Sequence, residues 1–226
     1  MATNRDRRLR MLEAARLYFV CDRLPGGRDP GPVLEAALRG GADIIQLREQ
    51  APRSAEELVS LADSFRRAAA DHGALFILND RPDLVAVCGA DGVHVGQEDM
   101  PVAEARELAG PEALVGLSTH SREQVEAACA GTGDHRPDQL SVGPVWATPT
   151  KEGRAGTGLA LIEYAAREAT IPWFAIGGIN PQNASSVVAA GAERIVVVRA
   201  IRDADDPEAA ARSLRESLEV GVGVRR

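Results

Sequence analysis

The chain has 226 residues, of which 45% are hydrophobic and 26% charged; this balance is typical of a folded globular protein and excludes a disordered chain. A formal net charge of −7 and an aromatic content of 4% argue against a nucleic-acid-binding protein. No apolar run approaches the roughly 18 residues that suggest a membrane span, and the polar segment after the first arginines does not match a signal peptide. The three cysteines, Cys21, Cys88 and Cys129, are too far apart for a paired metal site and odd in number, so we expect a cytoplasmic protein.

Short apolar runs alternate with longer helical patterns along the whole chain. Strands are predicted at Leu17–Cys21, Ile44–Leu47, Leu75–Leu78, Gly92–Val95, Leu114–Leu117, Gln139–Val142, Phe174–Ile176 and Ile195–Val198. Helices are predicted at Pro32–Arg39, Ser54–His72, Pro82–Cys88, Val102–Leu108, Arg122–Ala130, Leu159–Ala169, Pro181–Ala189 and Pro207–Val220. Because the strands lack a regular polar alternation, we expect both of their faces to be buried in a parallel sheet.

Two parallel architectures fit this pattern. A doubly wound sheet is possible, but no GxGxxG motif follows the first strand. Eight strand–helix units in a chain of this length favour a compact (β/α)8 barrel. We therefore predict an α/β fold with a single TIM-barrel domain over residues 1–226. Residues 1–16 form its N-terminal extension, in which Arg5–Arg16 is an additional helix that covers the bottom of the barrel.

Polar residues follow most of the predicted strands, at the barrel end where such folds carry their chemistry. Asp80 and Asp99 each stand just before a proline-containing helix start, so they are candidates either for helix N-caps or for a carboxylate pair that holds Mg²⁺. His94 lies inside a strand and is expected to be a packed, hydrogen-bonded residue. Gly177 and Gly178 fit a tight turn or a phosphate-binding turn equally well.

The chain contains a single lysine, Lys151, in the long loop after the sixth predicted strand. It stands beside two hydroxyl residues, Thr148 and Thr150, and glycines follow it. Such a loop is either a solvated surface segment or a lid that closes over a phosphorylated ligand, with the lysine as a mobile positive charge.

Six motifs together resemble the thiamine phosphate synthase family, from Leu17 to Ile201. They are Gln46-Leu47-Arg48-Glu49, Asn79-Asp80-Arg81, the run from Asp91 to Asp99, Ser118-Thr119-His120-Ser121, Gly143-Pro144-Val145 with Thr148-Pro149-Thr150-Lys151, and Ala175-Ile176-Gly177-Gly178-Ile179. Each motif alone is weak evidence, but their order on consecutive strand ends is specific.

The resemblance implies a transferase that joins an aminopyrimidine carrying a CH₂-diphosphate to the nitrogen of a thiazole phosphate. Thiamine phosphate and diphosphate are released, and a carboxylated thiazole would also lose CO₂. The family is expected to work dissociatively, with departure of the diphosphate before the thiazole attacks. The implied partners are small-molecule substrates, without nucleic acid or membrane, and a homo-oligomer is left open.

The resemblance also implies roles for individual residues. The pyrimidine diphosphate site would comprise Gln46, Arg48, Gln50, Asn79, Ser118 and Lys151, of which Arg48, Ser118 and Lys151 are the expected catalytic residues. The thiazole phosphate site would comprise Thr148, Thr150, Gly178, Val198 and Arg199. Asp80 and Asp99 would bind the cofactor Mg²⁺.

Two positions depart from the family pattern, which usually has lysine in place of Gln50 and serine in place of Arg199. These departures keep two alternatives open. One is a thiazole tautomerase of the same barrel family, with a histidine near the position of His120. The other is a barrel that binds thiazole phosphate or thiamine phosphate without catalysis.

Overall fold

The computed structural model describes residues 3–22, 24, 28–49, 54–147 and 155–223, with side chains up to residue 219, and its parallel strands close into an eight-stranded barrel. The strands are β1 (Leu17–Cys21), β2 (Ile44–Leu47), β3 (Leu75–Asn79), β4 (Gly92–Val95), β5 (Leu114–Thr119), β6 (Gln139–Val142), β7 (Trp173–Ile176) and β8 (Ile195–Val197). Each strand pairs with the next in chain order, and β8 pairs with β1. The predicted barrel is confirmed, and a doubly wound sheet is excluded.

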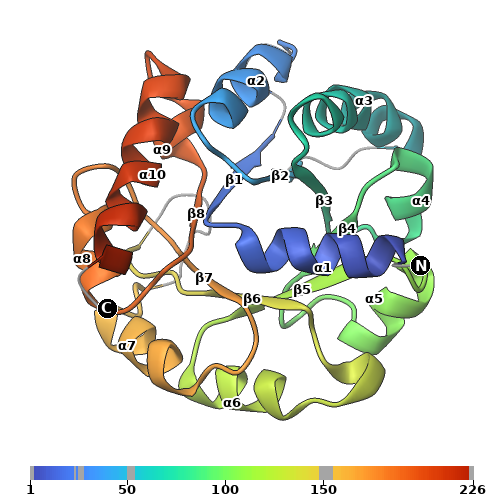
Figure 1. Ribbon diagram of the computed structural model, residues 1–226. Helices are drawn as coiled ribbons and strands as arrows, with labels where there is room; N and C mark the ends of the chain where they lie inside the picture. The colour runs from blue at the N-terminus through green and yellow to red at the C-terminus, as the bar shows by residue number, and fades with distance from the viewer. Residues whose placement is uncertain (1–2, 23, 25–27, 50–53, 148–154, 224–226) are drawn as a thin grey trace.

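The helices form an outer ring around the strands (Figure 1). They are α2 (Gly31–Arg39), α3 (Ala55–His72), α4 (Val85–Cys88), α5 (Val102–Ala109), α6 (Arg122–Ala130), α7 (Leu159–Glu168), α8 (Ala184–Ala189) and α10 (Pro207–Gly223). Two 3₁₀ turns, η2 (Pro82–Leu84) and η3 (Gly133–His135), precede α4 and β6. Two further helices are α1 (Asn4–Ala14), before the barrel, and the short α9 (Arg199–Arg202), directly after β8.

Helix α8 begins later than the sequence pattern predicted. The side-chain oxygen of Asn180 accepts hydrogen bonds from the backbone N–H groups of Gln182 (2.9 Å) and Asn183 (3.2 Å). Such a turn competes with helical hydrogen bonding, as is usual for asparagine. The residues from Pro181 therefore form a turn, and the helix starts only at Ala184.

Both faces of the strands are buried, as predicted from their lack of alternation. Leu17 and Phe19 of β1 pack outward against the helices, whereas Tyr18 and Val20 point into the barrel. On β3 the inward positions change from apolar Leu75 at the amino end to polar Asn79 at the carboxyl end. On β1 and β7 the inward Val20 and Ile176 keep the upper part of the barrel apolar.

Helix α1 crosses the amino ends of the strands and closes the floor (Figure 1), as the sequence predicted. Its Leu12 is buried against the inward apolar side chains of the barrel. Arg5 and Arg8 donate to the carboxylates of Asp138 (2.6 Å) and Asp91 (2.7 Å), which stand just before β6 and β4. Hydrophobic contact and ion pairs therefore both attach the extension to the barrel.

A carboxylate precedes three of the even-numbered strands and plays the same part each time. Asp43, Asp91 and Asp138 accept backbone N–H groups of the preceding odd-numbered strands. Each also pairs with at least one arginine. These carboxylates bind neighbouring strands together at the floor, and arginines balance their charge.

None of the helices in the described part of the chain combines the length and apolar character needed to cross a lipid bilayer.

The floor network predicts a large effect of Asp138→Ala on stability. The change leaves the Val115 N–H and the largely buried Arg106 guanidinium without this carboxylate, and we expect the free energy of unfolding to fall by about 3 kcal/mol. Asp63→Ala, which removes only exposed pairs with Arg66 and Arg67, should cost less than about 0.5 kcal/mol. Urea unfolding of both variants measures the difference, and equal losses would contradict this account.

Candidate active site

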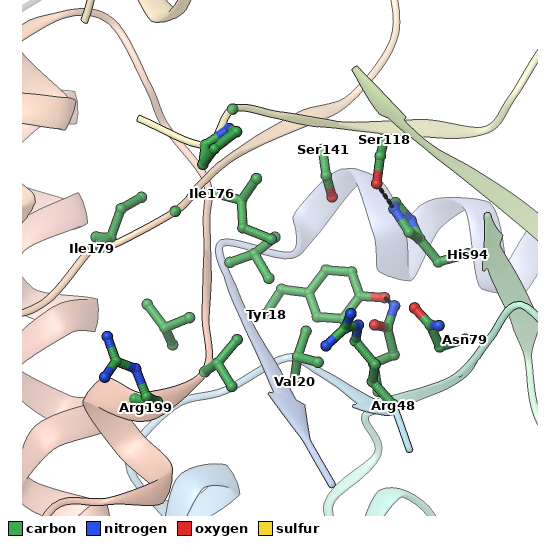
Figure 2. A pocket seen from close by; sticks show the side chains of 18 of the residues that line it. Tyr18, Val20, Arg48, Asn79, His94, Ser118, Ser141, Ile176, Ile179 and Arg199 are labelled. Carbon is green, nitrogen blue, oxygen red and sulfur yellow. Dashed lines mark hydrogen bonds between the residues drawn. The ribbon is translucent and has the colours of Figure 1, made fainter. Parts of the chain in front are cut away.

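A cavity of about 170 Å³ opens at the carboxyl ends of the strands. Figure 2 shows Arg48 and Asn79 on one side of it and Arg199 on the other, with Val20 and Ile176 between them. The cavity therefore has two polar walls joined by an apolar middle. Elements from β1 to β5 build the first wall, and the turns after β7 and β8 build the second.

The first wall carries a cation that is available to a ligand. The backbone N–H of Arg48 donates to the Cys21 carbonyl (2.9 Å), which fixes the residue just beyond β2. Its half-buried side chain makes no hydrogen bond or ion pair within the described part of the chain. A guanidinium in this position suits a forked contact with a phosphate group. Beneath it, the buried Gln46 amide donates to the Tyr18 hydroxyl (2.6 Å), which holds the amide in place.

Deeper in the same wall, three buried side chains form a hydrogen-bonded chain. His94 on β4 lies between Ser118 on β5 and Gln139 on β6, with 2.9 Å from each ring nitrogen to its partner. His94 is thus the packed, hydrogen-bonded residue that the sequence predicted. Ser118 and His94 both line the cavity, whereas Gln139 lies below it.

The carboxyl groups of Asp80 and Asp99 are in hydrogen-bonding contact at the rim, beside Arg48. Asp80 has a backbone φ of 57°, which is unusual for a residue other than glycine and turns the chain directly after β3. Both residues are exposed at the rim, but protein atoms crowd the Asp80 carboxyl. This burial, together with the nearby Asp99 carboxylate, raises the pKa of Asp80 from 3.8 to about 6.

Neither carboxylate is a helix N-cap, the alternative that the sequence left open. The position before η2 is Arg81 and the one before α5 is Pro101, and neither helix start has a side-chain cap. Asp99 instead accepts the Gly96 N–H (2.8 Å) and closes the turn between them. Asp80 accepts the side-chain amide of its neighbour Asn79, a residue that lines the cavity.

The donor set at the rim fits Mg²⁺ better than a metal with a closed protein shell. In the ranges described, no three His, Cys, Asp or Glu side chains cluster closely enough to hold a metal ion. Mg²⁺ is typically bound by one or two carboxylates, with substrate phosphates and water completing its shell. Two adjacent carboxylates with one raised pKa are suited to such a cation, because it removes their mutual repulsion.

The second wall depends on a turn that only glycine can form. Gly177 and Gly178 follow β7 with φ values of 107° and 69°. A Cβ on Gly177 would lie 2.4 Å from the Cβ of Pro144. The turn after β7 therefore packs directly against the loop after β6, with no room for a side chain at position 177. The Gly178 carbonyl accepts the Asn183 side-chain amide (2.9 Å), which fixes the turn against α8.

Arg199 supplies the charge of the second wall. It begins α9 after Val198, lines the cavity and is exposed, and its side chain has no ion pair with the described residues. The helix is anchored from its other end: Arg202 donates to both carboxylate oxygens of Asp22 (2.9 and 3.1 Å) at the end of β1. Within the described residues, Arg199 is therefore an unpaired cation on a helix that Arg202 holds in place.

The structure brings together most of the predicted site residues. Those that line the cavity are Gln46, Arg48, Asn79, Ser118, Gly178, Val198 and Arg199. Asp80 and Asp99 do not line it, but Asp80 directly follows Asn79 in the chain and has the Asp99 carboxyl and the Arg48 guanidinium close by. Gln50, Thr148, Thr150 and Lys151 lie outside the described residues. Sequence reasoning missed Tyr18 and Ser141, which also line the cavity. Tyr18 lies two residues before Val20 on β1, and Ser141 lies two residues after Gln139 on β6. Because alternate residues of a strand face the same side, this spacing could have identified both as inward-facing.

Comparison with known proteins was consistent across family, sequence and structure. The family model described as thiamine monophosphate synthase matches residues 17–201. The thiamine-phosphate synthase of Arthrobacter sp. (strain FB24) is 48% identical over 232 residues, covering 94% of this chain and 98% of that protein. That of Mycobacterium bovis (strain BCG / Pasteur 1173P2) is 48% identical over 217 residues, covering 92% and 96%. A solved thiamine phosphate pyrophosphorylase from Pyrococcus furiosus is similar with a TM-score of 0.81 and 31% identity, covering 94% of this chain and 100% of that one.

The raised pKa of Asp80 predicts a pH-dependent gain in stability from Asp80→Asn without metal. Since the folded protein binds the Asp80 proton more tightly than the unfolded chain, this carboxyl destabilises the fold as pH rises from 4 to 6, and the full penalty remains above about pH 6. Asparagine also suits the positive φ. In EDTA, the Tm of Asp80→Asn should exceed that of the wild type at pH 8 and match it near pH 4. An equal difference at both pH values would show that the carboxyl is not perturbed.

Proposed function

The chain belongs to the thiamine monophosphate synthase family, and we propose that it joins a pyrimidinylmethyl diphosphate to a thiazole phosphate to form thiamine phosphate. The observation that carries this proposal is the pair of polar walls on one cavity, each with a cation unpaired within the described part of the chain, Arg48 on one and Arg199 on the other. Two anionic substrates need two such sites, separated by space for their rings.

Arg48, Asn79 and Ser118 would bind the diphosphate. The reaction breaks the bond between the methylene carbon and the diphosphate oxygen, and the bonding electrons leave with the diphosphate. The guanidinium of Arg48 and the donors of Asn79 and Ser118 stabilise the charge that grows on this leaving group. Gln46, held by Tyr18, would contact the pyrimidine ring from below.

Asp80 and Asp99 would hold Mg²⁺ against the diphosphate. When bound, the cation neutralises part of the negative charge of the leaving group. The contribution of the chain is the paired carboxylates themselves, set at the rim by the positive φ of Asp80 and the turn that Asp99 closes.

The second wall would bind the thiazole phosphate through backbone N–H groups at Gly178 and Val198 and through the Arg199 side chain. The arginine stands where the family usually has serine, and its lack of a partner among the described residues favours phosphate binding over crowding. The phosphate would hold the thiazole nitrogen facing the methylene carbon, to which the nitrogen donates its lone pair as the C–N bond forms.

The apolar middle of the cavity would favour a dissociative reaction, because it would protect the cationic intermediate from water. Val20, Ile176 and Val196 line this part of the cavity and would offer water no hydrogen-bond partner beside the reacting carbon. A pyrimidine-stabilised cation formed there would meet the thiazole nitrogen before it met a water molecule. A carboxylated thiazole would lose CO₂ after this step.

Residues outside the described ranges complete the proposal. We assign Lys151 to the diphosphate and Thr148 and Thr150 to the thiazole phosphate, on the basis of the resemblance alone. Gln50, neutral where the family usually has lysine, leaves Arg48 with a larger share of the diphosphate charge. We place the enzyme in the cytoplasm, since its three cysteines are free thiols.

A direct synthesis assay tests this function. The protein, pyrimidine diphosphate, thiazole phosphate and Mg²⁺ should give thiamine phosphate, measured as fluorescent thiochrome, and EDTA should abolish the product. Asp99→Asn should lower kcat by about 100-fold or more, because one of two metal ligands is lost.

Asp63→Asn, an exposed carboxylate on α3, is the matched control and should keep the wild-type rate. Product that forms equally well in EDTA would contradict the metal assignment. A folded protein that makes no product but isomerises the thiazole would instead identify the tautomerase alternative.

A further inference from the structure

A glycine in the barrel wall allows two side chains on either side of it to meet. Gly116 on β5 is in register with His94 on β4 and with Gln139 on β6. A Cβ at position 116 would lie 2.1 Å from Gln139 Nε2 and 2.5 Å from His94 Nδ1. Only glycine therefore lets the Gln139 amide reach across β5 to the imidazole, at 2.9 Å.

This contact determines which ring nitrogen carries the proton. Gln139 Nε2 donates to His94 Nδ1, so a neutral ring must carry its hydrogen on Nε2. Gln139 Oε1 then has no hydrogen-bond partner among the described residues. Turning the amide over would give that oxygen a partner but would bury an NH₂ group without an acceptor. Buried N–H groups without a partner are rarer than buried carbonyls without one, which favours the orientation observed.

The proton on Nε2 in turn orients Ser118. His94 Nε2–H donates to Ser118 Oγ at 2.9 Å (Figure 2), so the hydroxyl is the acceptor in this bond. A hydroxyl that accepts from one side keeps its own hydrogen for another acceptor. Ser118 lines the cavity, on the wall that also carries Arg48 and Asn79. The opposite tautomer would make Ser118 donate to His94 and would remove one donor from the cavity.

We propose that Gly116 and Gln139 are positioning residues that hold His94 as its Nε2–H tautomer, so that Ser118 offers its hydroxyl hydrogen to an oxygen of the substrate diphosphate. The inference rests on the proposed function for the identity of that ligand. The tautomer itself follows from the contacts in the barrel wall and can be tested without substrate.

Nitrogen-15 NMR of the full chain measures the tautomer. Of the four histidines, His94 is identified by the signals that disappear in His94→Gln. At neutral pH we expect a protonated Nε2 and an unprotonated Nδ1, and tautomer-averaged signals in Gln139→Met. A protonated Nδ1 with an unprotonated Nε2 in the wild type would overturn the proposal, whether or not the protein is active.

A double-mutant cycle tests the path through Ser118. Ser118→Ala should lower kcat by about 100-fold, the usual cost of one lost transition-state donor. Gln139→Met should lower kcat by about 10-fold on its own and by less than about 2-fold in the Ser118→Ala background, with the KM for thiazole phosphate unchanged. If the losses in kcat of the two single variants multiply in the double variant, the two residues act independently and the proposal is overturned.

Thr119→Val is the matched control. Thr119 is on β5 next to Ser118 and does not line the cavity, and the change removes its buried hydrogen bond to the Ser141 carbonyl of β6. Its kcat should stay within about 2-fold of the wild type. If Gln139→Met does not fold, Gly116→Ala takes its place in the cycle, because the added methyl group separates His94 from Gln139. A wild type that makes no thiamine phosphate refutes the proposed function. An active wild type in which the two substitutions act independently on kcat refutes only this inference.

Discussion

The site depends on one constraint: a closed barrel buries both faces of its strands, so each inward polar group needs either a protein partner or a ligand. At the level of β4 to β6 the requirement is largely met inside the wall, where Gln139, His94 and Ser118 are joined by hydrogen bonds and Gln139 Oε1 is left without a partner among the described residues. One layer higher, Arg48 and Arg199 have no hydrogen-bond or ion-pair partner for their side chains in the described part of the chain. The place where internal pairing stops is therefore the place where a ligand is expected.

Carboxylates at the two ends of the barrel have opposite electrostatic environments. At the floor, Asp91 and Asp138 accept strand N–H groups and are paired with arginines of α1, so their charge stabilises the fold. At the mouth, Asp80 faces another carboxylate, and its pKa rises to about 6. A pairing that costs stability without a cation is characteristic of a functional site, and it separates the structural acids from those proposed to bind metal.

The barrel could be predicted from the sequence because short, mostly apolar runs alternate with longer helical patterns. The candidate site was also largely predictable, since Arg48 directly follows one such run and Asn79 and Asp80 follow another. The short helix α9 was missed because its four residues carry no period, and Asn180 converted a predicted helix start into a turn. The role of Gly116 could not be predicted, because it depends on two side chains that only the register of three strands brings together.

If the proposed function is correct, two anions occupy separate walls of one cavity at the same time. Calorimetric titration of Mg²⁺–diphosphate and of thiazole phosphate, each alone and each with the other saturating, measures this directly. We predict that both ligands bind together with Kd values changed by less than about 3-fold. Asp80→Asn should weaken only the diphosphate, and Arg199→Ser only the thiazole phosphate, by about 10-fold or more. Mutual competition between the two ligands, or a loss of both in Arg199→Ser, would show that the two walls do not bind separate anions.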